Sequence, residues 1–158
     1  MDKTKINVMN WMEYFLEIAE VVKLKSKDQS TQIGAVVVGE GNNVLSTGYN
    51  SFPRGLDDSL EERQQRPEKY FWIEHAERNA IYNAARIGVS TKGCSLYLSH
   101  WFPCVECTRA IIQSGITTLY CDPLDEKASN SNYNESFKRS IQMLREAGVE
   151  LRYYENIV

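Results

Sequence analysis

The chain opens with helical spacing and then changes to the pattern of buried strands. Apolar side chains recur every three to four positions between residues 11 and 27, which predicts a first helix with lysines at its C-terminal end. Residues 32–38 are nearly all apolar, and residues 44–49 follow a turn rich in Gly and Asn, so the two segments predict a β-hairpin. A strand without polar alternation indicates burial on both faces, as in a layered α/β protein.

Residues 50–70 interrupt this pattern with prolines, a glycine and a charged run. A connection of this length is usually functional or disordered. We expect a lid that brings Arg54, and as a second choice Arg63, to an anionic group of a substrate. The alternative is that the charged run forms a short solvated helix with no role in binding.

The second half of the chain alternates helical and strand patterns. The predicted elements, beginning with a helix, cover residues 74–86, 94–99, 103–114, 117–121, 134–147 and 149–153, with a polar loop over 122–133. A helix between the fourth and fifth strands is a crossover connection, so these two strands are expected to be parallel. No internal repeat is visible, and we expect residues 1–158 to form a single domain.

Composition narrows the classes of function. The chain has 18 Lys and Arg residues against 21 Asp and Glu residues, which argues against a dedicated nucleic-acid binder but is compatible with a small anionic substrate. No apolar run is long enough to span a bilayer, and no apolar segment follows the N-terminus as in a signal peptide. We therefore expect a cytoplasmic protein that binds neither membranes nor nucleic acid polymers and keeps its four cysteines reduced.

Two short motifs concentrate metal-binding and catalytic residue types at the starts of predicted helices. The first places His75 two residues before Glu77, and the second places Cys104 three residues before Cys107 and directly after a proline. One imidazole and two thiolates supply the three protein ligands of a catalytic zinc site, which leaves a fourth position open to water. Glu77 is close enough to exchange protons with that water without binding the metal. The positive ends of two helices would favour thiolate over thiol.

Each motif alone has a simpler explanation. A His-x-Glu sequence occurs by chance on many surfaces, and Cys-x-x-Cys is also typical of a redox pair or of half a zinc ribbon. A ribbon would recruit His100, Cys94 or Cys121 as its fourth ligand. However, Cys94 and Cys121 lie in strand-like runs, where buried inert thiols are expected. The occurrence of both motifs together favours the catalytic zinc site.

The two motifs resemble those of the zinc-dependent nucleobase deaminases. From about residue 11 to residue 153 the chain is similar to the deoxycytidylate deaminase family. Further shared segments are Gln32-Ile33-Gly34-Ala35, Gly48-Tyr49-Asn50, Pro53-Arg54-Gly55 and Ile111-Ile112-Gln113-Ser114-Gly115-Ile116. The resemblance implies a cytidine-deaminase-like fold, which is a three-layer α/β/α sandwich around a five-stranded mixed sheet. It also implies one catalytic Zn²⁺ per chain, held by His75, Cys104 and Cys107.

The same resemblance implies a reaction and a set of substrate contacts. The reaction is hydrolytic deamination of dCMP to dUMP and ammonia, in the supply of dTMP. Glu77 is expected to take a proton from water and deliver it to N3 of cytosine. The implied contacts are Asn50 at the sugar or base, Ala76 and Ser99 at the pyrimidine edge, and Tyr133 near the nucleotide. Arg54 is the expected phosphate contact, with Arg63 and Arg78 as second choices.

Two departures limit the resemblance. Ser51 stands where the family usually has glycine, in a segment associated with regulatory nucleoside triphosphates, so regulation by dCTP and dTTP is not implied. No histidine or cysteine precedes His75, so the additional structural zinc of some viral members is not expected. The family commonly forms dimers and hexamers. Small-residue faces on the helices predicted over residues 74–86 and 103–114 are expected to pack between subunits.

Two other functions compete with this one. A different deaminase of the superfamily would act on a free nucleoside, a base, a modified pyrimidine or tRNA adenosine, although the acidic net charge disfavours tRNA. A zinc-stabilised binding module without catalysis is disfavoured, because a structural site gains nothing from Glu77 beside an open coordination position.

Overall fold

One mixed sheet organises the described chain, which comprises residues 6–123 and 131–154 of this computed structural model. Its strands are β1 (Gly34–Gly39), β2 (Asn43–Tyr49), β3 (Ser95–Leu98), β4 (Thr118–Cys121) and β5 (Glu150–Tyr153). They lie in the order β2-β1-β3-β4-β5. β1 is antiparallel to β2 and β3, whereas β3, β4 and β5 are parallel to one another, which confirms the expected parallel pairing of the last two strands.

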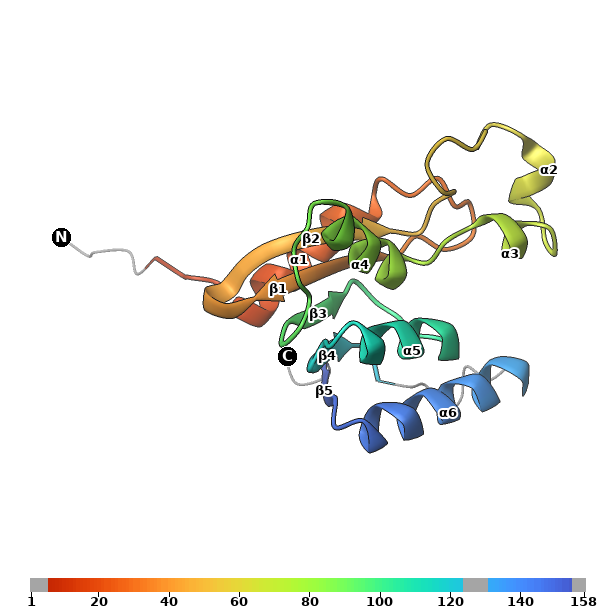
Figure 1. Cartoon of the computed structure of the whole chain (residues 1–158). Coiled ribbons are helices and arrows are strands. Elements are labelled where there is room, and N and C mark those ends of the chain that lie inside the picture. Colours follow the sequence, from red (N-terminus) through yellow and green to blue (C-terminus); the bar gives the residue numbers. More distant parts are fainter. Residues whose placement is uncertain (1–5, 124–130, 155–158) are drawn as a thin grey trace.

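Helices cover both faces of this sheet (Figure 1). One face carries α1 (Trp11–Lys23), and the other carries α4 (Ala76–Arg86), α5 (Val105–Gln113) and α6 (Ser131–Glu146). Two short helices, α2 (Glu61–Gln64) and α3 (Lys69–Trp72), project beyond one end of the sheet, and a 3₁₀ turn (Glu40–Asn42) joins β1 to β2. The expected three-layer α/β/α arrangement is therefore confirmed. No described helix has the length and apolar character to cross a membrane.

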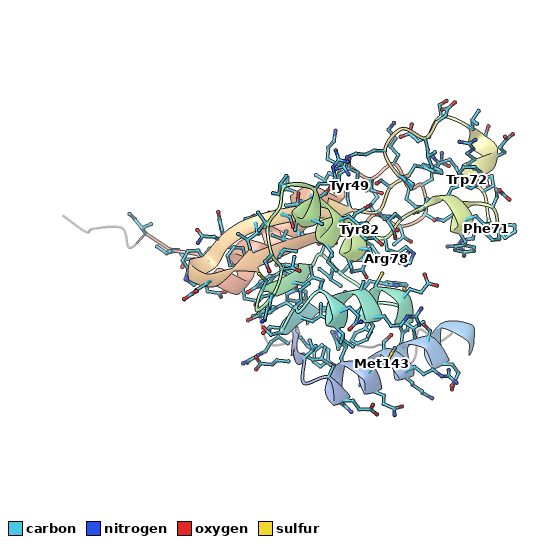
Figure 2. All side chains as sticks on the ribbon, in the orientation of Figure 1. Tyr49, Phe71, Trp72, Arg78, Tyr82 and Met143 are labelled. Atoms are coloured by element: carbon cyan, nitrogen blue, oxygen red, sulfur yellow. The ribbon has the colours of Figure 1, made fainter. Side chains whose placement is uncertain are left out.

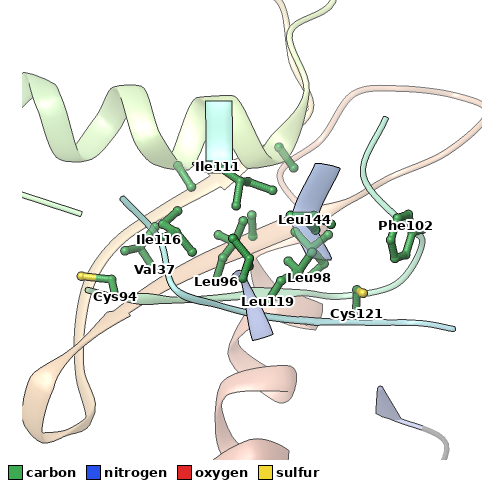
Figure 3. Close-up of a cluster of buried hydrophobic side chains, with 14 residues drawn as sticks. Val37, Cys94, Leu96, Leu98, Phe102, Ile111, Ile116, Leu119, Cys121 and Leu144 are labelled. Atoms are coloured by element: carbon green, nitrogen blue, oxygen red, sulfur yellow. The ribbon is translucent and has the colours of Figure 1, made fainter. Parts of the chain in front are cut away.

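Successive side chains of a strand point to opposite faces of the sheet, so those of β1 lie in two separate hydrophobic cores. Ala35 and Val37 of β1 belong to the core shared with α4, α5 and α6, while Val36 and Val38 belong to the core under α1. The larger core contains Leu96, Leu98, Ile111, Leu119 and Leu144 (Figure 3). The expected burial of the first strand on both faces is confirmed, since Ala35, Val36 and Val37 are completely buried.

A glycine lets α4 lie directly on β2. A Cβ atom on Gly48 would overlap the backbone of Ala76 and Ala80. The small side chains of Ala76, Ala80 and Ala84 are completely buried. The expectation that this face of α4 packs between subunits is therefore wrong, because the sheet of the same chain already occupies it.

The predicted end of α1 and the predicted start of α6 differ from the structure. α1 ends at Lys23 rather than at residue 27, and the chain beyond it turns so that the Ser26 hydroxyl donates to the carbonyl oxygen of Asn50 at 2.8 Å. α6 begins at Ser131 rather than at residue 134. Tyr133 therefore lies in the first turn of a helix and not in a loop, and its side chain is outside the described residues.

Candidate metal centre and active site

Two helix N-termini bring the three predicted metal ligands together. His75 is the N-cap residue of α4, Cys104 is the N-cap residue of α5, and Cys107 lies in the first turn of α5. The sulfurs of Cys104 and Cys107 lie 3.6 and 3.4 Å from Nδ1 of His75, and all three ligand atoms lie within 4.8 Å of one another. Both helices begin two residues later than predicted, so His75 and Cys104 cap them rather than lying inside the first turn.

The spacing of these atoms fits zinc. With Zn–N bonds of about 2.0–2.1 Å and Zn–S bonds of about 2.3 Å, a tetrahedral site separates nitrogen from sulfur by about 3.5 Å. Among the described residues the cluster contains one imidazole and two thiols without a fourth protein ligand, which is the donor set of a catalytic rather than a structural zinc. His75, Cys104 and Cys107 would hold the ion.

The two thiols of the cluster do not lose their protons independently. Hydrogen bonding with Cys107 lowers the pKa of Cys104 to about 3, against the opposing effect of burial and with help from His75. The same interaction with Cys104, together with burial, raises the pKa of Cys107 far above its usual value. One thiolate forms readily because its charge is shared, whereas a second one requires a cation at the centre. The pair is therefore suited to a divalent metal.

Glu77 lies beside this cluster, in the first turn of α4, with only 4% of its surface exposed. Burial raises its pKa, while the nearby charge of His75 lowers it in part. The carboxyl also interacts with Cys104 and Cys107, although it is not one of the clustered ligand atoms. A buried carboxyl next to a metal site is well placed to accept a proton and to return it.

An ion-pair network that the sequence analysis did not identify connects α4 to α5. Arg78 lies between the two helices (Figure 2), where its Nη1 donates to Glu106 Oε2 at 2.9 Å and its Nε donates to Glu74 Oε1 at 2.6 Å. The same oxygen of Glu74 accepts from the backbone N–H of His75 at 2.9 Å. Arg78, a second choice for phosphate binding, is thus paired with two carboxylates. The only signal in the sequence is the i,i+4 spacing of Glu74 and Arg78.

Asn50, predicted to contact the sugar or base, directly follows β2 and is held by the protein on three sides. Its Oδ1 accepts from the N–H of Ile33 at 2.8 Å. Its Nδ2 donates to the carbonyl of Thr31 at 2.7 Å and to Asp28 Oδ2 at 3.3 Å. Both amide hydrogens are therefore used, and one lone pair of Oδ1 remains for a further donor.

Ala76 and Ser99 lie where secondary-structure elements begin and end. Ala76 is the first residue of α4, so its N–H has no acceptor within the helix. Ser99 directly follows β3 and is buried. Its Oγ accepts from the N–H of Gly34 at 3.0 Å and lies 3.0 Å from Nδ1 of His100. The role predicted for Tyr133 stays a prediction, because its side chain lies outside the described residues.

Arg54, the expected phosphate contact, lies in a cavity of about 540 Å³. Asn50 and Asn83 also line this cavity, whereas the residues found to line it include neither Glu77 nor any metal ligand. The exposed Arg54 donates from Nη2 to Asn83 Oδ1 at 2.6 Å. Arg63 lies elsewhere, with its guanidinium 3.9 Å from the centre of the Trp72 ring. The structure thus brings Arg54 together with Asn50 but not with the predicted zinc ligands.

The remaining cysteines and histidine do not complete a zinc ribbon within the described residues. Cys94 and Cys121 belong to the larger hydrophobic core, as expected for inert thiols (Figure 3), and burial raises the pKa of both. His100 pairs with Ser99. None of these three residues joins the cluster of His75, Cys104 and Cys107.

Comparison with known sequences identifies the family. A family model described as the cytidine and deoxycytidylate deaminase zinc-binding region matches residues 9–122. An "Uncharacterized deaminase in luxG 3'region" of Aliivibrio fischeri is 38% identical over 146 residues, which cover 92% of this chain and 95% of that protein. The deoxycytidylate deaminase of Mus musculus is 40% identical over 119 residues, or 72% of this chain. The match spans 65% of the mouse protein, so this relative is substantially longer than the region it shares.

Solved structures agree with the sequence comparison. The dCMP deaminase of cyanophage S-TIM5, in complex with dCMP and dUMP, superimposes with a TM-score of 0.70 at 26% identity, over 97% of this chain and 99% of that one. This likeness confirms the cytidine-deaminase-like fold, and the family model confirms zinc as the expected metal. Because that model spans both the His-x-Glu and the Cys-x-x-Cys motifs, the chain belongs to the cytidine and deoxycytidylate deaminase family.

Proposed function

We propose that this protein hydrolyses dCMP to dUMP and ammonia, in the supply of dTMP. The observation that carries the proposal is the buried carboxyl of Glu77 beside a three-ligand metal cluster. The relatives support the choice of nucleotide, since the mouse protein is a deoxycytidylate deaminase and the cyanophage enzyme was solved with dCMP and dUMP.

In this proposal His75, Cys104 and Cys107 hold one Zn²⁺ per chain. When bound there, zinc supplies a Lewis acid that makes water nucleophilic near neutral pH. The chain contributes the placement of the ligands. Arg78 connects the first turn of α4 to Glu106 in the first turn of α5, and Glu74, its second partner, accepts from the backbone N–H of His75.

Glu77 moves the protons of the reaction. Its carboxylate takes a proton from the attacking water and delivers it to N3 of cytosine while the water oxygen bonds to C4. It carries the second proton of the water to the amino group, which leaves as ammonia. One carboxyl can both accept and donate a proton if its pKa lies near the working pH. Burial raises the pKa of Glu77 toward that range.

Backbone groups and buried polar side chains hold the nucleotide in this proposal. The N–H of Ala76 and the backbone at Ser99 read the pyrimidine edge, and the remaining lone pair of Asn50 Oδ1 accepts from the sugar or base. Tyr133, in the first turn of α6, lies near the nucleotide. Arg54 contacts the phosphate, since Asn83 uses only one of its five N–H donors.

The choice of substrate is tested by ammonia release from dCMP, CMP, deoxycytidine, dCTP and 5-methyl-dCMP. We expect the highest kcat/KM with dCMP and a much lower value with deoxycytidine, because deoxycytidine lacks the phosphate. Equal values for the two would reject the nucleotide and leave only the deaminase chemistry. An unchanged KM for dCMP in Arg54→Ala would reject Arg54 as the phosphate contact.

We also propose that the protein acts in the cytoplasm as a homo-oligomer, either a dimer or a hexamer. All four cysteines are free thiols, as is usual in a reducing compartment. The exposed face of α1 carries the large apolar side chains of Trp11, Tyr14 and Val21, which subunit contacts would cover. Light scattering that reports the mass of one chain would contradict the oligomer.

A further inference from the structure

The short helix α3 buries its charge and exposes its aromatic side chains. Only 7% of Lys69 is exposed, whereas 53% of Tyr70 and 82% of Phe71 are exposed. Figures 1 and 2 show this helix beyond the end of the sheet, with Phe71 and Trp72 at the extremity of the molecule. Trp72 is half-buried beneath the guanidinium of Arg63, and Lys69 is the one residue of α3 that is buried.

The ammonium group of Lys69 is fully engaged by a segment that lies about forty residues earlier in the chain. Its Nζ donates to Asp28 Oδ1 at 3.0 Å, to Asp28 Oδ2 at 2.9 Å and to Ser30 Oγ at 2.6 Å. An ammonium has three N–H donors, so each has an acceptor. The side chains of Lys69 and Asp28 are only 9% and 6% exposed.

Asp28 connects Lys69 to Asn50, because its carboxylate accepts hydrogen bonds from both side chains. Its Oδ1 accepts from the N–H groups of Ser30 and Thr31 at 2.8 and 3.1 Å, and its Oδ2 accepts from Nδ2 of Asn50 at 3.3 Å. Burial raises the pKa of Asp28, but the hydrogen bonds from Lys69, Ser30 and Thr31 outweigh it and hold the pKa below its usual value. Asp28 is therefore a charged acceptor under physiological conditions.

The orientation of the Asn50 amide is fixed by these neighbours. Because the N–H of Ile33 must meet an oxygen and the carbonyl of Thr31 must meet an N–H, the amide cannot rotate by half a turn without losing both bonds. The carboxylate of Asp28 reinforces the same orientation. This orientation determines which direction the remaining lone pair of Asn50 faces.

We propose that Lys69 is a positioning residue that, through Asp28, holds the Asn50 amide in the orientation that receives the nucleotide. The inference rests on the proposed function, in which Asn50 contacts the sugar or base. It links α3, which begins at Lys69, to Asn50, which directly follows β2. A buried ion pair gives little net stability compared with a well-packed apolar pair, so stability alone does not explain a lysine here.

Lys69→Met is the first test, with Lys92→Met as the matched control because Lys92 is exposed. We expect the KM for dCMP to rise about tenfold in Lys69→Met, which corresponds to the loss of roughly one hydrogen bond. Zinc content should stay equal to that of the wild type. The control should change KM by less than about twofold. A normal KM in Lys69→Met would overturn the proposal.

The double variant Asp28→Asn/Lys69→Met separates positioning from stability. It leaves no unpaired buried charge, so its Tm should recover relative to Lys69→Met. Its KM should stay raised, because an asparagine at position 28 has a single acceptor oxygen and cannot serve Ser30, Thr31 and Asn50 as the carboxylate does. Recovery of KM together with Tm would show that Lys69 only stabilises the fold, and would overturn the proposal.

Two further measurements separate this inference from the proposed function. In an Asn50→Ala background, Lys69→Met should raise KM by less than about twofold, since its effect acts through Asn50.

Hydrogen exchange of the Ile33 amide needs no substrate, and it should be faster in Lys69→Met but unchanged in Lys92→Met. If the wild type fails to deaminate dCMP, the proposed function fails while the exchange measurement still tests the link. Unchanged exchange in Lys69→Met would overturn the link itself.

Discussion

Burial and a neighbouring charge shift the pKa of the Glu77 carboxyl in opposite directions. Burial raises its pKa, and His75 opposes part of that rise. A glutamate whose only role was a favourable interaction with the dipole of a helix N-terminus could fulfil it equally well when exposed to solvent. Such an interaction would add little to the stability of the helix. The 4% exposure of Glu77 is therefore better explained by proton transfer.

Glu77→Gln should fold, bind zinc and lose activity by several orders of magnitude. The amide has almost the same shape as the carboxyl but cannot accept and return a proton near neutral pH. Ammonia release under saturating dCMP measures the loss, and metal analysis of the same sample provides the control. Turnover close to that of the wild type would remove Glu77 from the mechanism.

The residues closest to the chemistry were predictable, and those that support them were not. His75, Glu77, Cys104 and Cys107 stand in short motifs whose spacing reflects metal coordination. The partners of Lys69 lie about forty positions away in the chain, so no local pattern marks the pair. Lys69 also belongs to a charged stretch that resembles an ordinary solvated surface.

Acid should weaken the fold partly through Asp28. The pKa of this carboxyl in the folded protein lies below the ordinary value of 3.8, so its contribution to stability is complete above that value and is lost as the pH falls through the folded pKa. Between about pH 5 and pH 2, the free energy of unfolding should decline more steeply in the wild type than in Asp28→Asn. The difference is at most about 1.4 kcal/mol per pH unit, the effect of one proton. Chemical denaturation at several pH values measures it, and parallel curves would contradict it.

At the scale of elements, periodicity identified the strands and long helices but misplaced several ends. The burial of β1 on both faces follows from its continuous apolar run. α1 ends early, and Ser26 just beyond it contacts Asn50, a residue that no local pattern in the sequence connects to the helix. The alanine spacing of α4 alone favours a subunit contact, because the sequence does not show that Gly48 brings β2 against this buried face.

Gly48→Ala should be strongly destabilising. The new Cβ would overlap the backbone of Ala76 and Ala80, which cannot move without displacing the start of α4 and its metal ligand. We expect a loss of about 3 kcal/mol or more, at the upper end of the range for overpacking. Gly39→Ala is the matched control, because its Cβ would meet the end of the Leu45 side chain rather than backbone and should cost about 1 kcal/mol. Denaturant unfolding compares the two, and equal losses would contradict the close packing of α4 on β2.

At the scale of the whole molecule, removal of zinc should lower the melting temperature. The three ligands join the N-termini of α4 and α5, and the unfolded chain does not hold them together. Free zinc at 1,000 times its Kd would add about 4.1 kcal/mol to the free energy of unfolding. Thermal unfolding with and without a chelator measures the effect in the wild type.

Cys104→Ala provides the control for that experiment. It should melt at the same temperature with and without the chelator, whereas Cys94→Ala should respond as the wild type does, because Cys94 lies in the hydrophobic core. Equal responses of Cys104→Ala and Cys94→Ala would show that the metal is bound elsewhere.

The strand order β2-β1-β3-β4-β5 also determines when the metal site can form during folding. Only the three residues Glu40–Asn42 separate β1 from β2, so this hairpin closes over a short loop on a timescale of about microseconds. β3 pairs with β1 only after residues 50–94, which include α4, have been looped out between β2 and β3, and such non-local pairing is slower. His75 precedes β3 and both cysteines follow it in α5, so the ligand set can be complete only after β3 has docked. Zinc should therefore leave the early phase of refolding unchanged and affect only the later one.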